Sequence, residues 1–312
     1  MAIGDVAKVD GIAKANIQSI NAYTILSGVT PPLDTYTGAD YAYSVRLVRT
    51  AYTGAIMRVI RGTAGGTGHQ DEADISLYNG AVTLDSTLSN VSTGVNSTTL
   101  GQFINVGTVG GFTYTNPDNL TTTATAGVIK WYDQSTNGLD LTADNANLIG
   151  LIHDGFADTD LNKDNGIPII KVTNLATMTS GTYSYSTNNT VFCAIKRSST
   201  GSATVLSHVS GVLGYASSGS TSSADFGFGT TSYYQNGSEF QSSSPTRDDM
   251  YTATQTLSLF SILFGSNSAT YVRLGRLGSA AMYSAHELIG YPNQTVSRTG
   301  VETNLNDYYG IF

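Results

Sequence analysis

The chain has 312 residues, of which 40% are hydrophobic and only 12% are charged, and its formal net charge is −8. An acidic balance without a basic stripe excludes a nucleic-acid-binding class, and no stretch is long and apolar enough for a membrane span. Gly, Ser, Thr, Asn and Tyr take the place of charged residues, which is typical of turn-rich antiparallel sheet. The length suits one large β domain or two ordinary ones.

Residues 1–22 differ in pattern from the rest of the chain. Two short apolar segments flank Asp10-Gly11, a pair that suits the positive φ angles of a two-residue hairpin turn. A lone hairpin is marginal in water, so we expect an arm that docks on another subunit or a neighbouring protein. The alternative is an edge hairpin folded back on its own domain. The apolar arm residues are Val6, Val9, Ile12, Ile17 and Ile20.

Residues 23–35 are predicted to form a linker, because Pro31 and Pro32 disfavour a helix and favour an extended turn. The main domain is expected over residues 36–312. Residues 41–47 alternate apolar with polar or small side chains, as a half-buried strand requires. Four arginines fall in one segment, and we expect them to pair with acidic neighbours or across a hairpin, with subunit contact as the alternative: Arg46, Arg49, Arg58 and Arg61.

Residues 128–141 hold the only tryptophan, Trp131, and pass from a β-branched strand pattern into a polar turn. Asp133, at the end of the strand, can accept backbone N–H groups of that turn as an Asx-type lock. A ligand-binding role for Trp131 and Asp133 is the functional alternative. A catalytic Asp133 is a further alternative, since a glycosidase needs two carboxylates around the scissile bond.

The loop 158–166 is the best metal candidate in the chain. Oxygen-bearing side chains at alternate positions before a turn glycine are how calcium loops gather a hard cation. Lys163 in the middle and the absence of a distal bidentate glutamate argue for an ordinary hairpin turn at Asn165-Gly166 instead. No cofactor other than this candidate calcium ion is expected, and its ligands would be Asp158, Asp160, Asn162 and Asp164.

Short apolar segments continue at nearly regular spacing to the end of the chain, which is typical of a sandwich or jelly roll. Cys193 lies in one of them and is expected to be a buried core residue. A short helix is predicted over 299–308, with Ser297 or Thr299 as its cap. Tyr233, Tyr234 and Asn236 stand before an Asn-Gly turn and are the candidate glycan contacts, although both tyrosines could equally pack across strands.

Three stretches carry a resemblance to known proteins. The run WYDQSTNGLDLTADN resembles the WYDQSGNGN-type signature of concanavalin-like, laminin-G-like domains in structural proteins of tailed bacteriophages. Residues 42–61 and 287–311 resemble the same group. A related run occurs in the catalytic domain of fungal arabinofuranosidase B enzymes, but no residue here matches the catalytic carboxylates of that family. The resemblance implies an all-β, concanavalin-like jelly-roll sandwich with a short N-terminal β arm and a short C-terminal helix.

Arm and resemblance together predict a non-enzymatic virion protein, synthesised in the host cytoplasm. It would be a capsid decoration (cement) subunit or a fibre or appendage subunit, present as a homo-oligomer, most simply a trimer. Its partners would be further copies of itself and other virion proteins, such as the major capsid protein or tail and neck proteins, with no nucleic acid and no membrane span. The alternatives are a glycan-binding module that adsorbs to the host surface and a glycosidase that cleaves surface polysaccharide.

Overall fold

The structure is a computed structural model, and the strand pairings between its described residues are all antiparallel. Helices are few and short, so the expectation of an all-β protein is confirmed. The described residues are 8–9, 12–13, 29–62, 71–144, 150–172, 178–183, 189–197, 203–204, 206–208, 211–212, 215–216, 220, 230–240, 246–264, 271–274, 283–292 and 296–312.

The strands of the first half are β1 (Lys8–Val9), β2 (Ile12–Ala13), β3 (Tyr41–Ser44), β4 (Met57–Gly62), β5 (Glu72–Ile75), β6 (Leu88–Ser89), β7 (Thr108–Val109), β8 (Phe112–Thr113), β9 (Thr125–Trp131), β10 (Leu141–Ala143), β11 (Gly150–Asp154), β12 (Lys163–Asp164), β13 (Ile167–Pro168) and β14 (Ile170–Val172).

Those of the second half are β15 (Met178–Ser180), β16 (Thr190–Arg197), β17 (Ala203–Thr204), β18 (Leu206–His208), β19 (Gly211–Val212), β20 (Tyr215–Ala216), β21 (Thr230–Gln235), β22 (Ser238–Glu239), β23 (Ser258–Phe264), β24 (Arg273–Leu274) and β25 (Tyr283–Tyr291). The helices are α2 (Pro32–Thr35), α3 (Leu100–Phe103), α4 (Arg247–Ala253) and α5 (Arg298–Tyr309).

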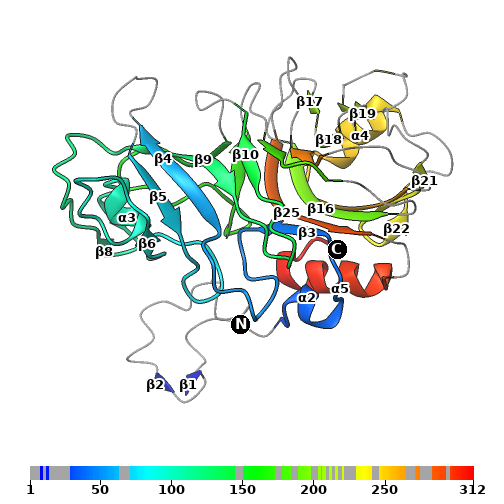
Figure 1. The fold of residues 1–312 in the computed structure, drawn as a ribbon, viewed down its shortest axis with the longest axis horizontal. Coiled ribbons are helices and arrows are strands. Elements are labelled where there is room, and N and C mark those ends of the chain that lie inside the picture. Colours follow the sequence, from blue (N-terminus) through cyan, green and yellow to red (C-terminus); the bar gives the residue numbers. More distant parts are fainter. Residues whose placement is uncertain are drawn as a thin grey trace.

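Strand β9 is the centre of one end of the molecule (Figure 1). It pairs with β4 along one edge and with β10 and β11 along the other, and β5 and β6 extend the sheet beyond β4. Side chains of β4 alternate between buried and half-buried positions. This alternation gives the sheet one face toward the core and one face toward the surface.

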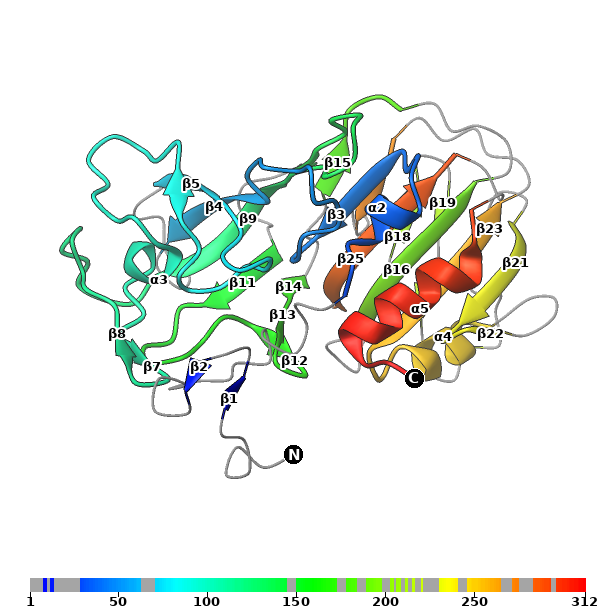
Figure 2. The ribbon, with the colours of Figure 1, turned by 90° about the horizontal axis from the view of Figure 1, so that it is seen from below.

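Strands β25 and β16 form the centre of the other end, where β23, β21 and β22 follow in order. All residues of β25 are buried, because both faces of this sheet are covered. Helix α5 lies along one face, as Figures 1 and 2 show, and buries Val301, Leu305, Tyr308 and Tyr309. Cys193 of β16 is buried, as expected, and burial raises the pKa of its thiol to about 12.

One route of pairings joins the ends: β11 pairs with β14 and β14 with β25. From the other side of the first end, β10 pairs with β15, β15 with β24 and β24 with β18. The pairings therefore link these strands into one large antiparallel sheet. It does not confirm the jelly-roll topology predicted from the sequence, since two separate packed sheets are not resolved in it.

Residues 23–28 of the predicted linker lie outside the described residues. The expectation that Pro31 and Pro32 disfavour a helix is wrong, because residues 32–35 form helix α2. Pro32 occupies the first helical position, where the missing N–H group costs nothing and the fixed φ angle suits a helix. Leu33 is buried, and its N–H donates to the carbonyl of Val48 at 2.9 Å. This segment is therefore held to the chain that follows β3.

The predicted N-terminal hairpin is confirmed in its backbone pairing: β1 pairs with β2 in a two-stranded sheet separate from the large one. Val6, Ile17 and Ile20 lie outside the described residues, as do the side chains of Val9 and Ile12. The docking role of the arm stays a prediction. No helix in the described part of the chain has the length and apolar character that crossing a bilayer requires.

Candidate functional site

The inner side of the 131–140 run is a structural lock. Asp133 accepts the N–H groups of Ala42, Ser135 and Leu139 at 2.8, 2.8 and 2.9 Å, and also the Ser135 hydroxyl at 2.7 Å. Trp131 is fully buried, and its Nε1 donates to the carbonyl of Ser44 at 3.2 Å. The backbone-lock interpretation of Asp133 fits these contacts. They do not support the ligand-binding assignment of Trp131 and Asp133.

Gln134 completes this lock. It is fully buried, its Oε1 accepts the N–H of Val48 at 3.0 Å, and its Nε2 donates to the carbonyl of Arg46 at 2.9 Å. The side chain thus satisfies backbone groups of the irregular segment after β3, which would otherwise lie buried without partners. The run fixes β3 to the end of β9.

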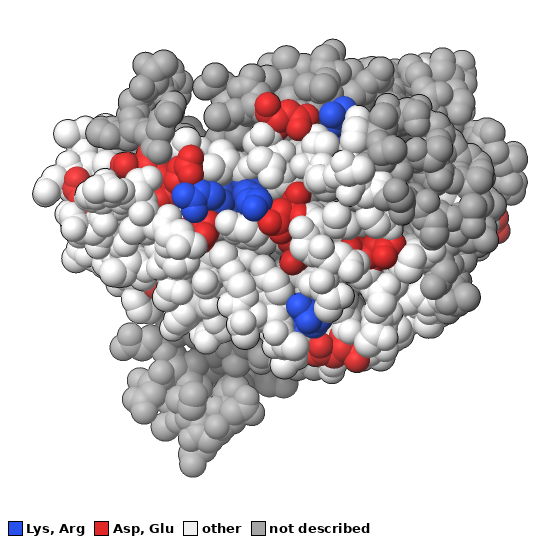
Figure 3. Space-filling view, viewed as in Figure 1, with Lys and Arg blue, Asp and Glu red and all other residues white. Residues whose placement is uncertain are grey.

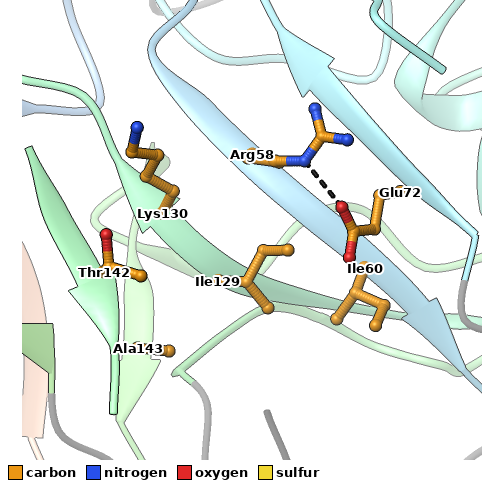
Figure 4. A pocket seen from close by; sticks show the side chains of 7 residues that line it. All are labelled: Arg58, Ile60, Glu72, Ile129, Lys130, Thr142 and Ala143. Atoms are coloured by element: carbon orange, nitrogen blue, oxygen red, sulfur yellow. Dashed lines mark hydrogen bonds and ion pairs between the residues drawn. The ribbon is translucent and has the colours of Figure 1, made fainter. Parts of the chain in front are cut away.

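The outer side of the same strands carries an open hollow of about 370 Å³, which we call the charged hollow. Figure 4 shows its lining from β4, β5, β9 and β10. A β-bulge shapes it: Lys130 pairs with Arg58 but Val128 pairs with Val59, so Ile129 is an extra residue in β9. A bulge redirects side chains locally, and both Ile129 and Lys130 face the hollow. The lining is Arg58, Ile60, Glu72, Ile129, Lys130, Thr142 and Ala143.

Arg58 organises the acidic side of the hollow. Its Nε lies 2.7 Å from Glu72 Oε2 and its Nη1 lies 2.9 Å from Asp74 Oδ1. Glu72 and Asp74 are alternate residues of β5, so they share one face of the strand. Burial alone would lower the pKa of Arg58, but the hydrogen bonds to Glu72 and Asp74 raise it above its usual value. The guanidinium is a permanent cation between two carboxylates.

Tyr132 and Asp140 extend this row across β9. The Tyr132 hydroxyl donates to Asp74 Oδ1 at 2.8 Å, and burial and that hydrogen bond raise the pKa of the phenol. Lys130 Nζ lies 4.8 Å from the centre of the Tyr132 ring and 2.8 Å from Asp140 Oδ2. Asp140 Oδ1 accepts the N–H of Asp133 at 3.0 Å. Asp140 thereby joins the hollow to the lock behind it.

Several polar atoms of the hollow make no hydrogen bond within the described residues: Glu72 Oε1, Arg58 Nη2 and the Thr142 hydroxyl. The Glu72 side chain is 35% exposed and that of Lys130 is 33% exposed, so solvent or a ligand can reach both. Figure 3 shows basic side chains in the middle of this face, with acidic ones on both sides. Donors and an acceptor therefore surround an apolar floor made by Ile60, Ile129 and Ala143.

The predicted calcium loop is not assembled. Asp160 pairs with Lys163 at 2.5 Å, Asp164 pairs with Lys196 at 2.7 Å, and Asp158 accepts the N–H of Thr108 at 2.7 Å. Asn162 donates to the carbonyl of Leu151 at 3.1 Å and to Asp154 Oδ1 at 3.0 Å. The four side chains turn to different partners, and Asn165-Gly166 forms the turn of hairpin β12–β13. Among the described residues, no group of three acidic, His or Cys side chains could hold a metal ion.

The predicted glycan contacts lie at the other end of the molecule from the charged hollow. Tyr233 packs against the core, and the Arg298 guanidinium lies 3.6 Å from the centre of the Tyr234 ring. Asn236 accepts the N–H of Leu259 at 3.0 Å and occupies the turn between β21 and β22. These contacts support the structural alternative of cross-strand packing. A glycan contact here stays a prediction.

Sequence reasoning missed the charged hollow. The arginine pattern gave one signal, and its pairing with acidic neighbours is confirmed for Arg46, Arg58 and Arg61. Arg49 instead donates to the carbonyls of Gln134 and Ser135 at 2.9 and 3.1 Å. Alternation along 58–60 and 72–74 marks an outer face, but only the register of β4, β5 and β9 brings these residues together.

No family model and no curated protein matches the chain. Among solved structures, an arabinofuranosidase complexed with arabinofuranosyl-α-1,2-xylobiose is 14% identical, with a TM-score of 0.48 over 89% of this chain. A mutant GH54 α-L-arabinofuranosidase soaked with 4-nitrophenyl α-L-arabinofuranoside is 12% identical, with a TM-score of 0.46 over 88%. The chain spans 65% and 63% of the length of these proteins.

These comparisons bear on two expectations. The resemblance to arabinofuranosidases is present as a distant likeness of fold, whereas neither a phage protein nor a concanavalin-like family was found. The sequence-based prediction of a protein without enzymatic activity is contradicted, because the similar solved structures are those of glycosidases. Catalysis is accordingly a property to be measured for this chain.

Proposed function

We propose that the charged hollow binds a saccharide. The observation that carries the proposal is the juxtaposition of free polar atoms with an apolar floor. Glu72 Oε1 can accept a sugar hydroxyl, Arg58 Nη2 and Lys130 Nζ can donate to one, and Ile129 lies between them. Sugar rings present apolar C–H faces and hydroxyls that both donate and accept. A volume of about 370 Å³ falls within the range of small-ligand pockets.

A glycan array probed with the purified chain tests this proposal. We expect binding that is lost in Lys130→Met and weakened in Thr142→Val, which removes one hydroxyl at nearly constant shape. Glu239→Gln is a matched surface control, because Glu239 is exposed in β22 at the far end of the molecule (Figure 1). Absence of binding to any glycan, or binding that survives Lys130→Met unchanged, would refute the proposal.

Cleavage of the bound saccharide is a second candidate function. The specific observation for it is the carboxylate pair on β5, since alternate strand residues lie roughly 7 Å apart and glycosidases use two carboxylates about 5 to 10 Å apart. Glu72 is half-exposed, whereas Asp74 is buried beneath Arg58 and Tyr132. Release of reducing ends from polysaccharide by the wild type, abolished in Glu72→Gln, would select this function. Release that persists in Glu72→Gln would exclude this carboxylate.

The association role in a virion remains a proposal beside these two. Its support is hairpin β1–β2, which pairs within itself and, as a two-stranded unit, gains stability from a covering partner. Strand addition between copies is the corresponding mechanism. The oligomeric state can be measured by light scattering after size-exclusion chromatography. The full chain is compared with a variant lacking residues 1–20. We expect the full chain to form an oligomer and the deletion variant to be a monomer. A monomeric full chain would contradict the proposed association role.

A further inference from the structure

The charged hollow does not balance its own charge. Two cationic side chains, Arg58 and Lys130, face three anionic ones, Glu72, Asp74 and Asp140, which leaves a net charge of −1. The whole chain adds to this field with its formal net charge of −8. A ligand that enters the hollow therefore meets a negative local potential.

The unbalanced charge can be assigned to one carboxylate. Asp74 is saturated, because its Oδ1 accepts from Arg58 and Tyr132 and its Oδ2 accepts from Asn90 at 2.6 Å. Asp140 is saturated as well, with Lys130 on one oxygen and the Asp133 N–H on the other. Glu72 accepts a hydrogen bond from Arg58 through Oε2 alone. Its Oε1 is the acceptor that stays available to a ligand.

We infer that the hollow prefers a saccharide that carries a free amino group and discriminates against uronates and other anionic sugars. An ammonium group beside Glu72 Oε1 would complete the charge balance, whereas a carboxylate or sulfate would add to the acidic excess. Arg58 and Lys130 do not reverse this preference, since each already has an acidic partner. The inference rests on the proposed saccharide site and names its ligand class.

The expected preference is modest, because the hollow is open to water. Two unit charges about 4 Å apart in water interact by about 1 kcal/mol, which corresponds to about fivefold in affinity. Salt screens such an interaction, so the preference should shrink at high ionic strength. A neutral sugar would stand between the amino sugar and the uronate.

Titration calorimetry with three tetrasaccharides of β-1,4-linked hexose tests the inference. One carries free amino groups (a chitosan oligomer), one carries N-acetyl groups (a chitin oligomer), and one carries carboxylates (an oligouronate). We expect affinity to fall in that order, with about a fivefold difference between the amino and the N-acetyl oligomer. The differences in affinity should become smaller at high salt. Tighter binding of the uronate or the neutral oligomer would overturn the inference and leave the saccharide site standing.

Two variants with the same change in net charge distinguish a direct contact between Glu72 and the ligand from an effect of the overall negative potential of the hollow. Glu72→Gln should abolish the preference for the amino oligomer, because the accepting carboxylate is lost. Asp140→Asn should weaken all three ligands through Lys130 but keep their order, and Glu239→Gln should change nothing. An equal loss of preference in Glu72→Gln and Asp140→Asn would contradict the assignment to Glu72. Failure of every saccharide to bind, here and on the glycan array, would refute the proposed function itself.

Discussion

Arg46 and Glu287 form an ion pair inside the protein, with 2.8 Å between Arg46 Nε and Glu287 Oε2 and side chains that are 2% and 0% exposed. Glu287 also accepts from the hydroxyls of Ser44 and Tyr309, both at 2.8 Å. The pair thereby ties the chain after β3 to β25 and to α5. Burial alone would lower the pKa of Arg46, but Glu287 raises it above its usual value.

Removing one partner of this pair should be costly. Arg46→Met leaves an uncompensated carboxylate in the interior, and we expect a loss of about 3 to 5 kcal/mol in the free energy of unfolding. Urea unfolding measures it. Arg46→Met combined with Glu287→Leu should recover part of the loss. Lys163→Ala, which breaks the exposed pair with Asp160, should cost about 0 to 1 kcal/mol; equal costs at the two sites would contradict the role of burial.

The Asp133 lock predicts a loss of stability. Asp133→Ala leaves buried N–H groups of Ala42 and Ser135 without an acceptor, at about 1 to 3 kcal/mol each. Asp133→Asn retains one acceptor oxygen and should fall between the alanine variant and the wild type. Thermal unfolding followed by circular dichroism checks this order. If Asp133→Asn kept the wild-type melting temperature but lost a measured activity, Asp133 would instead be a catalytic group.

His286 predicts a stability that depends on pH. Burial lowers the pKa of its ring from 6.5 to about 4, Lys196 adds to this, and Asp164 opposes it. Because the unfolded chain then binds a proton that the folded chain does not, stability is complete above pH 6.5 and declines as the pH falls toward 4. The total loss is about 3 kcal/mol. Urea unfolding across this window should give a flatter profile for His286→Leu than for the wild type; parallel profiles would disprove the assignment.

Gly290 of β25 lies against a buried aromatic ring. A Cβ atom at this position would overlap the ring of Tyr41, which is 1% exposed and has no space to move into. We expect Gly290→Ala to cost about 1 to 3 kcal/mol through overpacking. Gly181→Ala is the control, because a Cβ atom there meets no atom of a non-adjacent described residue within 4 Å. Chemical unfolding of both variants compares them, and similar stabilities would show that β25 can shift away from Tyr41.

Local signals predicted local structure well. The Asn-Gly turns at 165–166 and 236–237 have the positive φ angles that this dipeptide favours, with 50° and 81° at the first and 50° and 79° at the second. Ser297 caps α5 by accepting the N–H of Gly300, as predicted from its place before the helix. These features depend on neighbours within a few residues.

Features that depend on distant neighbours escaped prediction. The partner of Asp133 at Ala42 lies 91 residues away in sequence. The charged hollow requires the registers of β4, β5 and β9 together with a bulge at Ile129, and none of these can be read from periodicity. Pro31 and Pro32 suggested an extended segment because the same residues suit both a turn and the first turn of a helix.

The two sides of residues 130–142 have different roles in the structure. Positions 131, 133 and 134 are committed inward to holding β3, whereas positions 130 and 142 face outward and hold nothing in the interior. A WYDQS motif in another protein would therefore indicate a common framework and leave its substrate undetermined. At the proposed saccharide site, specificity could then be re-engineered through the outer positions while the inner contacts to β3 are kept.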